Sequence, residues 1–149
     1  MSISILNLRS ARMTGVIVAA ITATLFALSS GVTLAASNQV KLTGDKEVPA
    51  VETTATAEGT IAIGTDKTVS GTIKTKGIVG TVAHIHLAAP GKNGPPIITL
   101  TKSSDDSWVV PAGAKLTDEQ FASYQAGDLY VNVHSAAHPS GEIRVQLTP

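Results

Sequence analysis

Short runs rich in β-branched and apolar residues, separated at brief intervals by glycine and proline, dominate the chain from residue 37 to its end. Runs of this length fit strands and are too short for most helices. Within 68–75, Val69, Gly71 and Ile73 alternate with polar residues and share one face, as on a half-buried strand. The runs that predict strands are 40–43, 58–63, 68–75, 81–87, 97–101, 129–134 and 142–147. Short strands at this spacing predict an all-β fold, and we expect a single antiparallel β-sandwich of Greek-key type.

One segment departs from the strand pattern and predicts a short helix. Thr117 has the side chain of an N-cap, Gln120 follows three residues later as in a capping box, and Gly127 marks the end. Phe121 and Tyr124 lie three residues apart and share a face of this helix. We expect a helix of about two turns that crosses between strands.

The first 36 residues have the features of a secretory signal peptide. Arg9 and Arg12 precede an apolar run at 16–28, and the small residues at 33–36 suit a signal peptidase. The apolar run is shorter than the roughly 20 residues that span a bilayer, which favours cleavage over an uncleaved membrane anchor. We therefore expect a signal peptide at 1–36 and an exported domain at 37–149, periplasmic or extracellular, with no membrane-spanning segment.

Charge and cysteine content exclude several classes of protein. The chain has eleven basic and eleven acidic side chains and no cysteine. From residue 37 on, nine basic and eleven acidic residues remain, so the expected domain is mildly acidic and does not suit nucleic acid. Without cysteine there is no disulfide framework, no lipidated cysteine and no thiolate metal site. A domain of this length buries a core without such cross-links.

Four histidines follow the expected signal peptide, and they fall in two short stretches. His84 and His86 are separated by one residue on a predicted strand, so both side chains point to the same face of the sheet. In the strand that ends at His134, the valines take the core face, and Tyr130, Asn132 and His134 take the opposite, outer face. His138 lies on the connection to the last strand.

If the two strands that carry His84, His86 and His134 are neighbours, three imidazoles converge on the outer face of the sheet. Neutral imidazole binds Zn(II) and Cu(II), and three histidines with an open position are a recognised metal arrangement. We therefore predict a copper or zinc site at His84, His86 and His134, with His138 as a further candidate ligand on a loop. The outward-facing residues that would orient the ligands from behind are Asn132, Glu142 and Arg144. The alternative is that all four histidines are surface residues that only brace loops.

The sequence lacks the patterns of familiar catalytic sites. It has no nucleophile elbow and no cysteine nucleophile. The carboxylate pairs fit structural roles, because Asp105 and Asp106 fall in a polar loop and Asp118 and Glu119 in the first helical turn. Trp108 is expected in the core or in a lid. The run 88–96 predicts a tight surface turn and does not match a phosphate-binding loop. We expect a binding protein more than an enzyme.

The sequence resembles the chordin-type (CHRD) domain family over nearly all of 40–147. Two departures stand out, because Val145 replaces a common glycine and Pro96 stands where a β-branched residue is usual. The matching pieces are Leu42-Thr43-Gly44, Glu47-Val48-Pro49, His84-Ile85-His86, Gly91-Lys92-Asn93-Gly94-Pro95, Leu116-Thr117, the run 126–134, which ends in Tyr-Val-Asn-Val-His, and Pro139-Ser140-Gly141-Glu142-Ile143-Arg144.

The resemblance implies an extracytoplasmic β-sandwich and supplies no established biochemical activity. The His-x-His strand is also similar to that of the copper-zinc superoxide dismutases, which are β-sandwiches with histidines on an outer face. This chain lacks the disulfide cysteines and the histidine-rich zinc loop of those enzymes. Arg144 is the one residue that would guide an anion in such an enzyme.

Three hypotheses about function follow from these observations. The first is an exported module that binds copper or zinc through histidines. The second is a non-enzymatic interaction module for an envelope or extracellular protein, with its working surface at the turn 88–96 or on a sheet edge. The third is a redox enzyme of dismutase type, for which a bound metal is necessary and far from sufficient.

Overall fold

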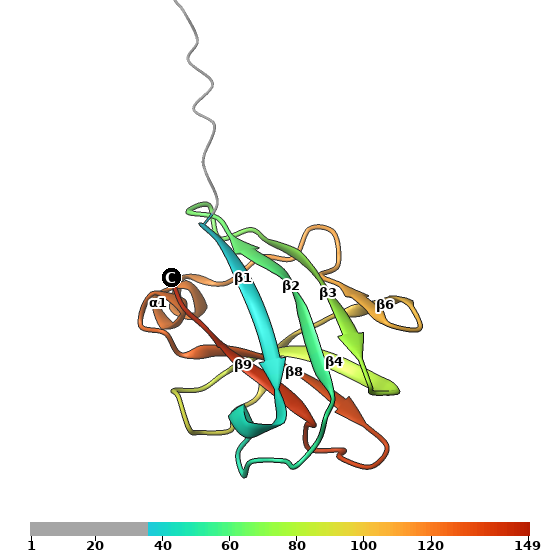
Figure 1. The fold of residues 1–149 in the computed structure, drawn as a ribbon. Coiled ribbons are helices and arrows are strands. Elements are labelled where there is room, and N and C mark those ends of the chain that lie inside the picture. Colours follow the sequence, from blue (N-terminus) through green and yellow to red (C-terminus); the bar gives the residue numbers. More distant parts are fainter. Residues whose placement is uncertain (1–35) are drawn as a thin grey trace, which may run out of the picture. The chain divides into compact units, whose positions relative to one another are not determined.

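The computed structural model describes residues 36–149, and these residues fold into an antiparallel β structure with one α-helix. Figure 1 shows β1, β2 and β3 side by side, with β4, β8 and β9 forming a second group of strands. The strands are β1 (Ala36–Thr43), β2 (Thr56–Ile63), β3 (Val69–Lys76), β4 (Gly80–Leu87), β5 (Pro96–Thr99), β6 (Thr101–Ser104), β7 (Ser107–Val109), β8 (Leu129–Ser135) and β9 (Ile143–Leu147). The helices are the 3-10 turn η1 (Gly44–Lys46) and α1 (Asp118–Gln125). The predicted all-β class with one helix is confirmed.

Hydrogen bonding joins all nine described strands into one sheet, in the order β5-β4-β8-β9-β1-β2-β3-β7-β6. A single residue pair, Thr43 with Arg144, links β1 to β9 in the middle of this order. The two end strands, β5 and β6, are consecutive in the chain and are separated only by Leu100. The backbone N–H of Leu100 donates to the carbonyl of Ala83 on β4. The sheet is therefore nearly closed on itself, where the sequence predicted a sandwich.

The hairpin of β6 and β7 was not predicted from the sequence. The residues of β6 are all exposed and polar, so the hairpin has none of the hydrophobic alternation that marks the other strands. The expected strand 97–101 is divided between β5 and β6. Trp108 on β7 is buried in the core. The sequence had predicted a place either in the core or in a lid. A polar strand held by its neighbours carries too little pattern to be read from sequence.

The helix α1 begins and ends as its sequence predicted. The Thr117 side chain accepts from the backbone N–H of Gln120, and the Gln120 side chain accepts from the backbone N–H of Thr117. Asp118 in the first turn pairs with Lys67, which gives that carboxylate a structural role. The buried Tyr124 hydroxyl accepts from Asn38 of β1 and donates to the carbonyl of Thr148, so α1 ties both ends of the described chain together.

The core lies between the two groups of strands and is built from the inward positions of their alternating patterns. Leu42, Ile61 and Ile73 come from the first group, and Ile85 and Val131 come from the second; all five are fully buried. The predicted signal peptide at 1–36 lies outside the described residues, apart from Ala36. Among residues 36–149, no helix is long and apolar enough to cross a membrane.

Candidate metal centre

The two strands that carry the histidines, β4 and β8, are paired in the structure, which meets the condition stated for the metal site, and their register sets the positions of the histidines. His84 lies opposite Asn132, His86 opposite Tyr130, and His134 opposite Val82. Because side chains alternate along a strand, His84, His86, Asn132 and His134 all stand on the same face of the sheet. The opposite face of the same strands carries core residues such as Ile85.

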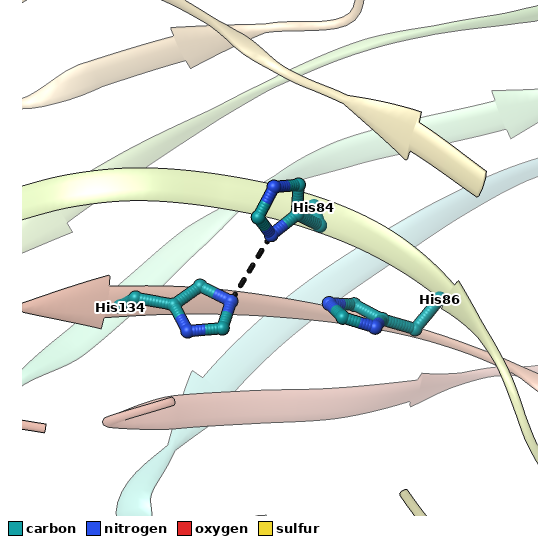
Figure 2. A group of neighbouring side chains, drawn as sticks. All are labelled: His84, His86 and His134. Atoms are coloured by element: carbon teal, nitrogen blue, oxygen red, sulfur yellow. Dashed lines mark hydrogen bonds between the residues drawn. The ribbon is translucent and has the colours of Figure 1, made fainter. Parts of the chain in front are cut away.

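Three imidazoles converge on this face. His84, His86 and His134 each offer a ligand atom, and these atoms all lie within 4.8 Å of one another. His84 Nδ1 is 3.1 Å from His134 Nε2, and Figure 2 shows His86 turning a ring nitrogen toward the same region. Metal–nitrogen bonds of about 2.0–2.1 Å place neighbouring ligand atoms about 3 Å apart, so only small side-chain movements separate these rings from a ligand set.

Backbone carbonyls fix the orientation of two of the three rings. His86 Nδ1–H donates to the carbonyl of Gly94 over 2.9 Å, and His134 Nδ1–H donates to the carbonyl of Pro139 over 3.0 Å. In each neutral ring the proton is therefore on Nδ1, and Nε2 carries the lone pair. His84 Nδ1 donates to His134 Nε2 in the metal-free protein. His86 Nε2 is buried and has no hydrogen-bond partner.

Burial keeps the three rings neutral. Desolvation is the largest influence on each of them and lowers the pKa of His84, His86 and His134 below the ordinary value of 6.5. The neighbouring histidines lower the pKa of His84 and His86 further. A lowered pKa leaves the nitrogen lone pairs available to a metal at neutral pH, because protons compete for them only under more acidic conditions.

These pKa shifts predict how the stability of the metal-free protein depends on pH. Below pH 6.5 the unfolded chain takes up protons that the folded histidines do not, so the free energy of unfolding falls as the pH drops. The fall ends below the folded-state pKa values. Urea unfolding with a chelator present, from pH 7.5 to 5, measures this slope. A His134→Gln variant should show a shallower slope than wild type, and an equal slope would contradict the assignment.

The face that carries the histidines lies opposite the core, as predicted, but it is largely covered, with His84 still partly exposed. Every residue of β8 is buried, and Arg144 on β9 is only 2% exposed. The turn 88–96 covers this face because Arg144 donates to Asn93 Oδ1 and to the carbonyl of Lys92. Alternation along the strand correctly separated two faces, but it could not show that a loop would bury the second one.

Arg144 and Tyr130 form a stack against His86. The Tyr130 ring lies 4.7 Å from the His86 ring, centroid to centroid, and is nearly parallel to it. The Arg144 guanidinium carbon lies 3.4 Å from the centre of the Tyr130 ring. A cation over an aromatic face is attractive, so the stack holds the His86 ring from one side. Because the guanidinium is buried and bonded to protein acceptors, Arg144 is not placed to guide an anion in from solvent.

The other predicted site residues lie in two different places. His138 is outside the histidine cluster, and its backbone N–H donates to the Ser135 hydroxyl while its carbonyl accepts from Gly141. The Glu142 carboxylate accepts from the Thr53 hydroxyl and is not part of the histidine cluster. Asn132 does stand among the histidines, on the same face and buried.

Sequence reasoning missed Glu47 as a site residue. Its side chain is 6% exposed, and Oε1 has no hydrogen-bond partner. Burial raises the pKa of Glu47, although Arg144 and Asn132 act in the opposite direction. The only sequence signal was the Glu47-Val48-Pro49 piece of the family resemblance, because the residue follows η1, far along the chain from the histidines.

Comparison with known proteins gives one result that covers most of the chain. The model of the CHRD domain family matches residues 38–147, which include all nine strands apart from the first two residues of β1. The searches of curated proteins and of solved structures found no match. The match includes the three histidines, Asn132 and the covering turn 88–96. The chain belongs to the CHRD domain family.

Proposed function

We propose that this CHRD domain is an exported metal-binding module that holds copper or zinc at His84, His86 and His134. The single observation that carries the proposal is the convergence of three neutral imidazoles, with their ligand atoms within 4.8 Å of one another. CHRD domains occur in extracellular or exported proteins, which supports a role outside the cytoplasm after removal of the segment 1–36.

The kind of donor supports copper or zinc over other metals. Imidazole nitrogen suits Cu(II) and Zn(II), whereas Ca(II) and Mg(II) prefer oxygen ligands. No carboxylate belongs to the cluster among the described residues, and the chain has no cysteine. A site of this composition therefore has little affinity for the hard cations that are abundant outside the cell.

The hydrogen bonds of the site support a metal-binding role. Two rings are already fixed in orientation with Nε2 unprotonated, which reduces the ordering required when a metal arrives. A buried imidazole nitrogen without a partner costs stability, and a metal ion would satisfy it. If His86 merely braced a loop, its buried Nε2 would be expected to have a hydrogen-bond partner, and it has none.

Calorimetric titration of the untagged, metal-free protein with Cu(II), Zn(II) and Mg(II) tests this proposal. We expect one equivalent of Cu(II) or Zn(II) to bind with a Kd below about 1 µM, and no heat from Mg(II). Failure of both Cu(II) and Zn(II) to bind this tightly would contradict the proposal and leave the interaction module as the better hypothesis.

A further inference from the structure

Three buried polar atoms without hydrogen-bond partners lie in one neighbourhood. Only four buried side-chain atoms of this kind occur in the part of the chain that the structure describes, and one of them belongs to Trp108 in the core. The other three are His86 Nε2, Asn132 Oδ1 and Glu47 Oε1. Buried polar groups are nearly always paired, so a group of three unpaired atoms requires an explanation.

Asn132 stands in the middle of the candidate metal centre. It is directly opposite His84 across the β4–β8 pair and two residues before His134 on the same face of β8. It is 2% exposed. In an antiparallel pair, side chains directly opposite have Cβ atoms about 5 Å apart, and diagonal neighbours remain within reach. Asn132 therefore stands on the same face as the three imidazoles and is a strand neighbour of His84 and His134.

The two ends of the Asn132 amide face different groups. The amide oxygen Oδ1 is buried and has no hydrogen-bond partner. The surroundings of Gly141 indicate where the amide nitrogen lies. A Cβ on Gly141 would stand 2.6 Å from Asn132 Nδ2 and 2.5 Å from Glu47 Oε1, so these two atoms approach the same point. The amide nitrogen thus lies on the side of the Glu47 carboxyl group, and the unpartnered oxygen is the other end of the same planar amide.

We propose that Asn132 Oδ1 is a fourth ligand of the metal held by His84, His86 and His134, and that Glu47 is the positioning residue that holds and polarises the Asn132 amide. This inference rests on the proposed metal-binding function and names residues beyond its three histidines. An amide oxygen is known as a weak axial ligand in copper sites of two histidines and one cysteine, and the same oxygen donor is available here beside three histidines.

The charge of the site gives Glu47 a physical role. The three imidazoles are neutral, and Arg144 adds a positive charge two rings away, behind Tyr130 and His86. A divalent ion in such a site has no anionic ligand. A carboxylate next to Asn132 Nδ2 draws the amide N–H toward itself and increases the negative charge on Oδ1, so Glu47 strengthens the oxygen ligand without contacting the metal.

Cu(II) titration and electron paramagnetic resonance of three variants test the inference. Asn132→Leu keeps the size of the side chain and removes the amide; Glu47→Gln keeps the shape and removes the charge. Glu142→Gln is the matched control, because Glu142 is also buried but bonds to Thr53. Outer ligand partners typically change metal affinity by about 10–100-fold. We expect Asn132→Leu to weaken Cu(II) binding by about this factor and to change the spectrum, Glu47→Gln to have a smaller effect of the same kind, and Glu142→Gln to have none.

The double variant Asn132→Leu/Glu47→Gln shows whether Glu47 acts through Asn132. If it does, the double variant binds Cu(II) no more weakly than Asn132→Leu alone. Additive losses, or Asn132→Leu with wild-type affinity and an unchanged spectrum, would overturn the inference while leaving the histidine site intact. Absence of tight Cu(II) and Zn(II) binding in the wild type would instead overturn the proposed function itself. Thermal unfolding of each metal-free variant confirms that the compared proteins are folded.

Discussion

Replacement of His134 by alanine is expected to weaken Cu(II) or Zn(II) binding by at least about 100-fold, because loss of a ligand should cost no less than loss of an outer partner. His134 contributes its Nε2 to the cluster and lies 3.1 Å from His84 Nδ1. Without it, the two histidines of β4 remain, and two imidazoles do not make a tight site for either metal. Calorimetric or competition titrations of the variant and the wild type measure the difference.

The chain offers its own control for this experiment. His138 is the one histidine of the described chain outside the cluster, and its backbone makes hydrogen bonds to Ser135 and Gly141. His138→Ala should therefore bind copper and zinc with wild-type affinity. Equal losses in the two variants, or wild-type binding by His134→Ala, would contradict the three-histidine site.

Replacement of Arg144 by methionine is expected to destabilise the metal-free domain by about 1–3 kcal/mol, because it removes the charged donor of part-buried hydrogen bonds. The change leaves the Lys92 carbonyl and Asn93 Oδ1 without their donor and leaves Glu47 without its nearby cation. It also removes the group that lies over Tyr130. Urea unfolding followed by tryptophan fluorescence measures the loss, since the single Trp108 is buried in the core.

Lys92→Ala is the matched control for Arg144. The Lys92 side chain is exposed, and only its backbone carbonyl contributes to the contact with Arg144. Its removal should change the free energy of unfolding by less than about 0.5 kcal/mol. A cost below about 1 kcal/mol for Arg144→Met would mean that the covering turn 88–96 is held by other contacts.

Much of the site could be predicted from sequence because it follows from strand periodicity. A side-chain period of two puts His84 and His86 on one face wherever their strand lies. Only one long-range fact was needed beyond this, namely that β4 pairs with β8, and the pairing brings in His134 and Asn132. Local patterns also sufficed for α1, whose capping box is contained in four residues.

The parts that sequence could not give depend on contacts between distant segments. The sheet is nearly closed because its two end strands, β5 and β6, follow one another in the chain with only Leu100 between them. No local sequence pattern predicts this connection. Burial of the histidine face depends on Arg144 reaching Asn93, a contact across 51 residues. From the sequence, Glu47 has the pattern of an exposed acidic residue two positions before a proline. Only folding brings it close to Asn132 and Arg144. The structure likewise separates His138 and Glu142 from the histidine cluster, although both are near His134 in sequence.

The most direct test of the three-histidine centre is to count the imidazoles around the bound metal. The protein is loaded with one equivalent of Cu(II) and studied by pulsed electron paramagnetic resonance, which detects the remote nitrogen of each coordinated imidazole. Extended X-ray absorption fine structure of the Zn(II) form provides the metal–nitrogen distances. We predict three coordinated imidazoles, two in the His134→Ala variant, and nitrogen at about 2.0–2.1 Å from zinc. A spectrum with one imidazole or none, or one unchanged by His134→Ala, would contradict the account.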